Sequence, residues 1–128
     1  MIRILSDAST RYVDNISVGA YLLYNYENDL VLKNSFFIEN LDNNYCEMFT
    51  IYQSLQESLK LGFKSVEVFT DSEFVIRKFY HLKGTESKNL RKLSGKIMSI
   101  STKFEKIKLI QVNRIHVEEA HVLCNLLR

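Results

Sequence analysis

Residues 65–72, with the sequence SVEVFTDS, constrain the fold of this chain more than any other stretch. They are rich in β-branched and aromatic side chains and follow a turn signal at Gly62, which predicts a short buried strand ending at Asp71. A helical pattern begins at Ser72. In an open α/β sheet, ligands bind just beyond the carboxyl ends of the parallel strands. Asp71 is therefore placed for chemistry, although an Asp or Ser here is also a common helix N-cap.

The spacing of apolar residues predicts three strands, a helix, a strand, two helices, a strand and a helix. Strands are expected at residues 2–5, 16–26, 30–38 and 107–112, in addition to the one that ends at Asp71. Helices are expected from residues 41–44 to near Gly62, and at 73–80, 90–104 and 117–127, with a loop at 82–87. A hairpin meander followed by strand-helix units predicts an α/β fold with a mixed sheet and helices on both faces.

The size and composition of the chain indicate one globular domain covering residues 1–128. Hydrophobic residues make up 46% of the 128 positions, which is enough to form a core. A chain of this length is large enough for one domain and too short for two. The longest apolar run, residues 18–24, is far shorter than a membrane span, and residues 1–7 lack the apolar core of a signal peptide. A soluble cytoplasmic protein is expected. Cys46 and Cys124 lack metal-ligand spacing, so we expect reduced thiols.

Charge is segregated along the chain. Residues 1–76 contain five Lys or Arg and eleven Asp or Glu, whereas residues 77–108 contain ten and two. The predicted helix within the basic segment carries Lys88, Arg91 and Lys92 off its apolar stripe. Such a layout suits a polyanion that is held by one surface and processed through bound cations at another. A solvated basic helix face is the alternative interpretation.

Two further carboxylates occupy positions that match that of Asp71. Asp7 follows the first predicted strand, and Glu47 lies beside the apolar stripe of the first long helix, one residue before Met48. The tips of the first and fourth strands are expected to be neighbours, and Glu47 can point toward them. The alternative is an exposed helix glutamate, which is the usual environment of this residue type.

Four motifs, in register with the predicted elements, resemble ribonuclease H of type 1 in its compact bacterial, archaeal and plant-like branch. In chain order they are Asp7-Ala8-Ser9, Glu47, Thr70-Asp71-Ser72, and Val112-x-Arg114 followed by Ala120-x-x-Leu123. The resemblance implies a ribonuclease H-like fold with a five-stranded mixed sheet, strand order 3-2-1-4-5, in which strand 2 is antiparallel. It also implies a metal-dependent endonuclease that cleaves the RNA strand of RNA–DNA hybrids.

The resemblance implies two divalent ions, Mg²⁺ or Mn²⁺, held by Asp7, Glu47 and Asp71. Hard cations prefer oxygen ligands, and a pair of them can activate a water and stabilise a leaving 3′ oxygen. Without metal, the mutual repulsion of the carboxylates should raise the pKa of at least one of them. Substrate contacts are expected at Ser9, Asn43, Ser72, Lys88, Arg91 and Lys92. Asn43 serves equally well as a helix cap.

The fourth metal-ligand position departs from the family pattern. The family usually has Asp directly after the alanine of the last motif, whereas this chain has His121. A neutral imidazole there can bind the second metal and favours Mn²⁺ relative to an all-oxygen site. Glu118, one helical turn earlier, is an alternative ligand. A site that has lost its second metal, in a domain that binds nucleic acid without cutting it, is the other possibility.

Other functions receive less support from the sequence. A proofreading-type exonuclease on a related fold would need an Asp-x-Glu pair on the first strand, and Ser9 occupies the second place. The expected partner is an RNA–DNA hybrid, and no obligate protein partner is evident.

Overall fold

The structure is a computed structural model that describes residues 1–81 and 87–127. Within these residues, five strands form one sheet in the order β3-β2-β1-β4-β5. β1 is antiparallel to β2, β2 is antiparallel to β3, and the pairs β1–β4 and β4–β5 are parallel. The strands span Ile2–Arg11 (β1), Ile16–Tyr24 (β2), Leu30–Ile38 (β3), Ser65–Thr70 (β4) and Lys106–Gln111 (β5). The predicted sheet and its strand order are confirmed.

β1 is longer than the sequence pattern predicted. It continues to Arg11, whereas the prediction ended it at Leu5, because the apolar run stops there and residues 10–15 are polar and turn-like. Pairing with β2 extends from Arg3 to Arg11, but pairing with β4 stops where Leu5 lies beside Phe69. The hairpin partner satisfies the backbone of the polar residues and so keeps them in the strand. Asp7 therefore lies inside β1, two residues beyond the last pairing with β4.

β2 is shorter than predicted, because a turn replaces its last two expected residues. The side-chain oxygen of Asn25 accepts hydrogen bonds from the backbone N–H groups of Glu27 and Asp29, at 3.0 and 2.9 Å. Asn28 adopts a positive φ of 67°, a conformation that asparagine tolerates better than most residues. The chain is thus turned back into β3 directly after Tyr24.

The helices agree with the predicted ones to within a few residues. They are α1 (Asn43–Lys60), α2 (Glu73–His81), α3 (Lys88–Ser101) and α4 (Glu118–Leu127), with a short 3-10 helix η1 (Arg114–Val117) before α4. Asp42 is the N-cap of α1, since its side chain accepts from the Asn44 N–H at 2.9 Å, so the interpretation of Asn43 as the cap is wrong. Ser87 caps α3. The predicted loop otherwise falls on residues 82–86, outside the described part of the chain.

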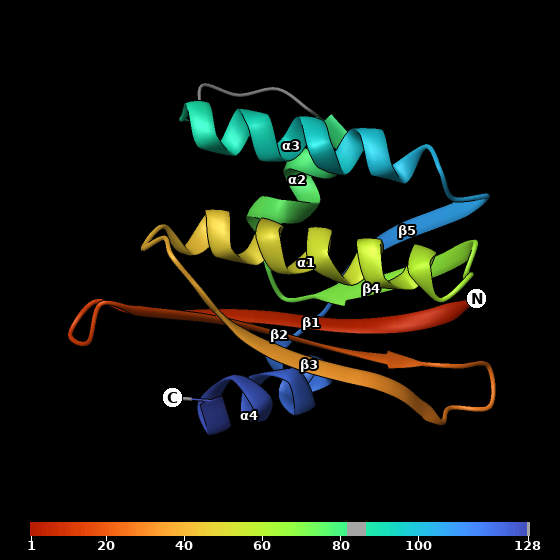
Figure 1. Cartoon of the computed structure of the whole chain (residues 1–128), viewed down its shortest axis with the longest axis horizontal. Helices are drawn as coiled ribbons and strands as arrows, with labels where there is room; N and C mark the ends of the chain where they lie inside the picture. Colours follow the sequence, from red (N-terminus) through yellow and green to blue (C-terminus); the bar gives the residue numbers. More distant parts are fainter. Residues whose placement is uncertain (82–86, 128) are drawn as a thin grey trace.

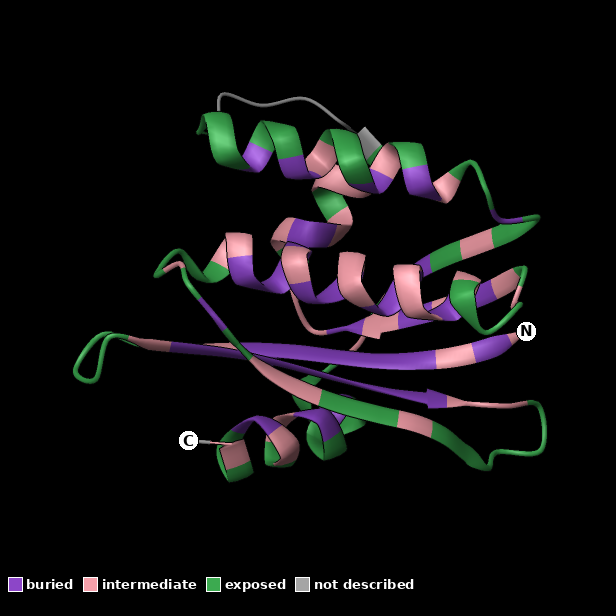
Figure 2. Cartoon of the chain, viewed as in Figure 1, coloured by how far each residue is buried: buried purple, intermediate pink, exposed green. Residues whose placement is uncertain are grey.

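The helices form layers on both faces of the sheet, as predicted (Figure 1). α1 packs against β1 and β2 on one face, and α4 packs against β1, β2 and β3 on the other. α3 lies on α1 and α2, farther from the sheet. Figure 2 shows the result: β1 is buried along most of its length, and α3 exposes its outer side. None of the helices within residues 1–81 and 87–127 is long and apolar enough to cross a membrane.

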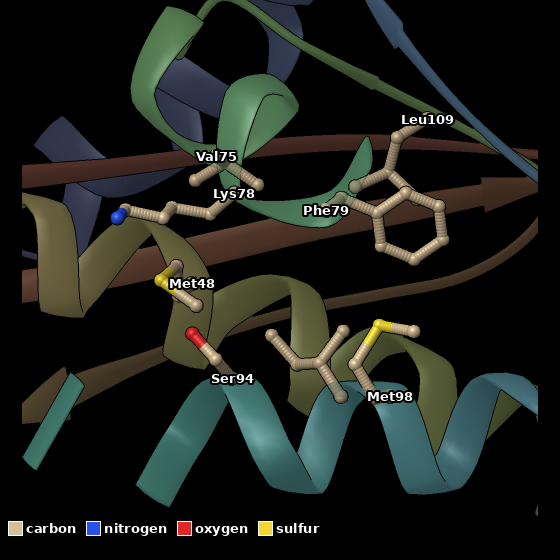
Figure 3. Close-up of a pocket in the computed structure, with 8 residues that line it drawn as sticks. Met48, Val75, Lys78, Phe79, Ser94, Met98 and Leu109 are labelled. Carbon is tan, nitrogen blue, oxygen red and sulfur yellow. The ribbon is translucent and has the colours of Figure 1, made fainter. Parts of the chain in front are cut away.

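The main core lies between the sheet and the layer formed by α1, α2 and α3. Its fully buried members include Ile4, Leu23, Ile51, Leu55 and Val68. A void of only about 10 Å³ remains where α1, α2, α3 and β5 meet. Figure 3 shows Met48 and Met98 directed into this junction, so Met48 belongs to the core although its neighbour Glu47 does not. α1 therefore has one side fixed by core packing.

Candidate active site

Asp7, Glu47 and Asp71 come together at one edge of the sheet. Among the described residues they form a group in which one carboxylate oxygen from each lies within 4.8 Å of the others. β1 and β4 run parallel, and Asp7 and Asp71 each follow the paired residues Leu5 and Phe69 by two positions. α1 packs on the face of the sheet formed by β1 and β2 and contributes Glu47 to the group. Residues from β1, α1 and the end of β4 thus meet in space, as the sequence predicted.

The turn after β4 holds Asp71 between two hydrogen-bonded neighbours. The Thr70 hydroxyl accepts from the Ser72 N–H at 3.1 Å, and the Ser72 hydroxyl accepts from the Val75 N–H at 3.2 Å. Ser72 therefore satisfies the first turn of α2, which is the usual task of a cap residue. The Asp71 carboxylate is left half-buried and directed at the cluster.

Glu47 is buried rather than exposed, which excludes the interpretation of it as a surface helix residue. Only 5% of its surface is accessible. It accepts a hydrogen bond from the Ala8 backbone N–H, yet its Oε2 atom has no hydrogen-bond partner within the described residues. A buried polar atom without a partner is costly and requires an explanation. A bound cation in the adjacent cleft would supply the missing interaction.

The raised pKa values of the clustered carboxylates also favour a cation site. Burial, then repulsion by Asp71, raises the pKa of Asp7 from 3.8 to about 6, despite a hydrogen bond from His121 and the nearby charge of Arg114. Burial, then the charges of Asp7 and Asp71, raises the pKa of Glu47 well above its ordinary value. The predicted rise in pKa is thus present. Carboxylates that resist ionisation together become stable as anions once a cation is among them.

The donor set fits a divalent cation. It consists of carboxylate oxygens close enough to share an ion, and one of them is buried and unpaired. Hard ions such as Mg²⁺ and Mn²⁺ bind oxygen ligands of this kind.

His121 approaches the cluster from α4, on the other face of the sheet. Its Nδ1 lies 3.1 Å from Asp7 Oδ2. Arg114 Nη2 lies 2.6 Å from Nδ1 and 2.8 Å from Nε2 of the same ring, and Asn125 Nδ2 lies 3.3 Å from Nε2. A guanidinium only donates hydrogen bonds, so a ring nitrogen of His121 acts as the acceptor in this contact. Glu118, the alternative ligand suggested by the sequence, lines a separate groove with Leu22 and Leu126 instead of the cleft over the carboxylates.

An open cleft of about 470 Å³ lies over the cluster. The expected substrate-binding residues Ser9, Asn43 and Ser72 line it. Its other lining residues are Asp7, Ala8, Thr10, Tyr12, Glu47, Asp71 and Arg114. Arg114 belongs to a motif of the sequence but was not expected to line the cleft, and neither Thr10 nor Tyr12 was identified from the sequence. Thr10 and Tyr12 lie so close to Asp7 because β1 continues past it, which the prediction missed.

The expected phosphate-binding residues Lys88, Arg91 and Lys92 lie outside this cleft. All three are exposed on α3. Lys92 lines a smaller groove of about 120 Å³ between α3 and α1. The other residues of this groove are Tyr45, Phe49, Tyr52, Asn89, Leu93 and Lys96. The basic surface and the acidic cluster are thus separate features.

Comparison with known proteins agrees with this fold. A family model described as reverse transcriptase-like matches residues 5–127. RNase H1 from the halophilic archaeon Halobacterium salinarum superposes with a TM-score of 0.89 at 21% identity, over 97% of this chain and 94% of its own. The N-terminal RNase H domain of a Mycobacterium tuberculosis protein has a TM-score of 0.88 at 20% identity, over 97% and 95% of the two chains.

A further solved structure is that of LC11-RNase H1, isolated from compost by a metagenomic approach. In complex with an RNA/DNA hybrid it has a TM-score of 0.88 at 20% identity, covering 98% of this chain and 95% of its own. A comparison with curated proteins found no match. The chain belongs to the reverse transcriptase-like family, and its fold is that of ribonuclease H type 1, which confirms the resemblance recognised in the sequence.

Proposed function

We propose that this protein is a metal-dependent endonuclease that cleaves the RNA strand of RNA–DNA hybrids. The observation that carries the proposal is the convergence of Asp7, Asp71 and the buried, partly unpaired carboxylate of Glu47 beneath an open cleft. One protein of the same fold was solved with an RNA/DNA hybrid, which supports a hybrid as the substrate class. The three carboxylates would hold the ions.

When bound, divalent cations supply an activated water and stabilise charge on the leaving 3′ oxygen. The protein's own residues position the strand for this step. Ser9, Asn43 and Ser72 line the cleft and offer hydroxyl and amide groups. Hydrogen bonding to a 2′-hydroxyl is what distinguishes RNA from DNA. Arg114, at the rim of the same cleft, offers a guanidinium that suits a phosphate.

In this proposal His121 is the further metal ligand, because its ring adjoins Asp7 and presents an acceptor nitrogen to Arg114. A nitrogen ligand shifts the preference of the site toward Mn²⁺ relative to Mg²⁺. Both ring nitrogens contact other groups in the structure, so Arg114 must release one of them before the ring can bind an ion.

The same contact favours a second candidate function, which is binding of a hybrid without cleavage. The Arg114 guanidinium lies against the only imidazole that adjoins the cluster within the described residues, and it already brings a positive charge there. Fold alone does not decide between a nuclease and a binding domain. The two functions differ in whether cleaved RNA is produced.

The test is incubation of an end-labelled RNA–DNA hybrid with the protein in Mg²⁺ and, separately, in Mn²⁺, with DNA and RNA duplexes of the same sequence as controls. Internal cuts in the RNA strand of the hybrid alone support the proposed function. Tight binding with no cut in either metal supports the second candidate. Cleavage of the DNA duplex at the same rate would remove RNA–DNA hybrids as the specific substrate.

A further inference from the structure

Gly19, in the middle of β2, lies against α1. A Cβ atom at this position would lie 2.2 Å from Thr50 Oγ1, in α1, and 3.1 Å from two ring atoms of Phe36, in β3. Its backbone does not have the positive φ that singles out Gly62. The close approach of the helix, rather than an unusual backbone conformation, therefore explains why the position has no side chain.

Gly19 is also paired across the sheet with the part of β1 that carries Asp7. Its cross-strand partner in β1 is Ala8, whose N–H donates a hydrogen bond to Glu47, and the neighbouring pair is Asp7 with Ala20. Thr50 follows Glu47 by one helical turn on the same buried side of α1. The contact between β2 and α1 thus lies directly beside the point where Glu47 reaches β1.

Thr50 cannot give way easily. It is fully buried, and its hydroxyl donates to the Cys46 carbonyl at 2.8 Å. Rotation of the Thr50 side chain away from residue 19 would break this hydrogen bond and leave a buried hydroxyl without its partner, which is costly. A methyl group at residue 19 would therefore have to move α1 away by roughly 1 Å to reach ordinary van der Waals separation. Metal sites tolerate only about ±0.2 Å in ligand distances.

We infer that Gly19 is a positioning residue, which lets α1 lie low enough on the sheet for Glu47 to share a cation with Asp7 and Asp71. This inference rests on the proposed function only in taking Glu47 as a metal ligand. Gly19 touches neither metal nor substrate. It acts through Thr50 and the height of α1, and its effect should therefore be reversed by shortening Thr50.

The test is the affinity for Mn²⁺, measured by titration calorimetry on the wild type, Gly19→Ala, Thr50→Ala and the double variant. We expect Gly19→Ala to bind Mn²⁺ at least about tenfold more weakly, the scale seen when a residue that supports a ligand is changed. We expect the double variant to bind within about threefold of Thr50→Ala, because removal of the Oγ1 atom makes room for the new methyl group.

Gly95→Ala is the matched control. Gly95 lies in α3, and a Cβ there meets nothing within 4 Å in the described part of the chain. The same chemical change should leave Mn²⁺ affinity as in the wild type. Melting temperatures of all variants separate a local displacement of Glu47 from a general loss of stability, since weak Mn²⁺ binding by a Gly19→Ala protein that is still fully folded at the titration temperature is not explained by unfolding.

The outcomes are distinct from those of the proposed function. Wild-type protein that binds no Mn²⁺ contradicts the function itself. Wild-type binding that is unchanged in Gly19→Ala overturns the inference alone, and so does a double variant that stays as weak as Gly19→Ala. If Gly19→Ala does not fold, a folded double variant with the affinity of Thr50→Ala supports the inference, and an unfolded double variant overturns it.

Discussion

Asp7 Oδ2 lies 3.1 Å from Nδ1 of His121, although the two residues are 114 positions apart in the chain. Asp7 is in β1 and His121 is in α4, whereas Glu47 reaches Asp7 from α1 on the opposite face of the sheet. A helix from each face therefore places a side chain beside the same carboxylate. In the proposed mechanism Asp7 is therefore the one carboxylate ligand that lies next to both the other carboxylates and His121.

Asp71→Asn tests the carboxylate ligands. We expect it to abolish cleavage of the hybrid while largely sparing hybrid binding, because asparagine keeps the shape of the turn after β4 but loses the anionic oxygen that a hard cation requires. Cleavage is followed on a labelled hybrid and binding by fluorescence anisotropy. Cleavage retained by this variant would refute the assignment of Asp71.

His121→Ala tests the fourth ligand. We expect cleavage in Mn²⁺ to fall at least about tenfold, since metal affinity and activity respond on that scale to changes around a metal site. Glu118→Gln is the control, because Glu118 lines a groove away from the cleft and its removal should leave the rate unchanged. Equal rates for the wild type and His121→Ala would exclude His121 from the mechanism. A loss of activity confined to Glu118→Gln would assign the role of fourth ligand to Glu118.

The pKa of Asp7, raised by burial and by Asp71, predicts how the stability of the metal-free protein depends on pH. The folded state holds its proton up to about pH 6, whereas the unfolded state releases it near 3.8. Stability is therefore highest below the lower value and falls as pH rises through this window. The loss attributable to Asp7 is at most about 3 kcal/mol.

This window is checked by urea unfolding in a chelator at several pH values between 3.5 and 7. The difference in unfolding free energy between the wild type and Asp7→Asn should shift steadily across the window, to the disadvantage of the wild type. Mn²⁺ or Mg²⁺ added above pH 6 should restore stability to the wild type and much less to the variant. A difference that shifts in the opposite direction with pH would show that Asp7 is stabilised, not strained, as an anion.

The exposed basic residues of α3 are expected to bind phosphates. Replacing Lys88, Arg91 or Lys92 by Ala should weaken hybrid binding and lower the slope of log affinity against log salt by about one for each phosphate that the protein no longer neutralises. The measurement uses the Asp71→Asn protein, so that the hybrid stays intact. Lys33→Ala is the control, since Lys33 lies in the groove beside α4. An equal change in slope for the control would remove α3 as the binding surface.

Much of the fold was predictable from the sequence, because apolar spacing in elements such as α1 and the alternation in β4 reflect which sides are buried. The extension of β1 was not, since residues 6–11 are polar and their strand conformation depends on pairing with β2. The burial of Glu47 was not predictable either, because it arises from the packing of α1 on β1 and β2, which are distant from it in the sequence. The Arg114 contact with His121 likewise arises only when η1 and α4 pack together.

The most direct test of the central claim is anomalous diffraction from crystals of the protein grown or soaked in Mn²⁺. We predict two Mn²⁺ peaks at the edge of the sheet where β1 and β4 lie side by side, one bound by Asp7, Glu47 and Asp71, the other by Asp7 and His121. Anomalous density absent from among these carboxylates at saturating Mn²⁺ would contradict the claim that they form a cation site.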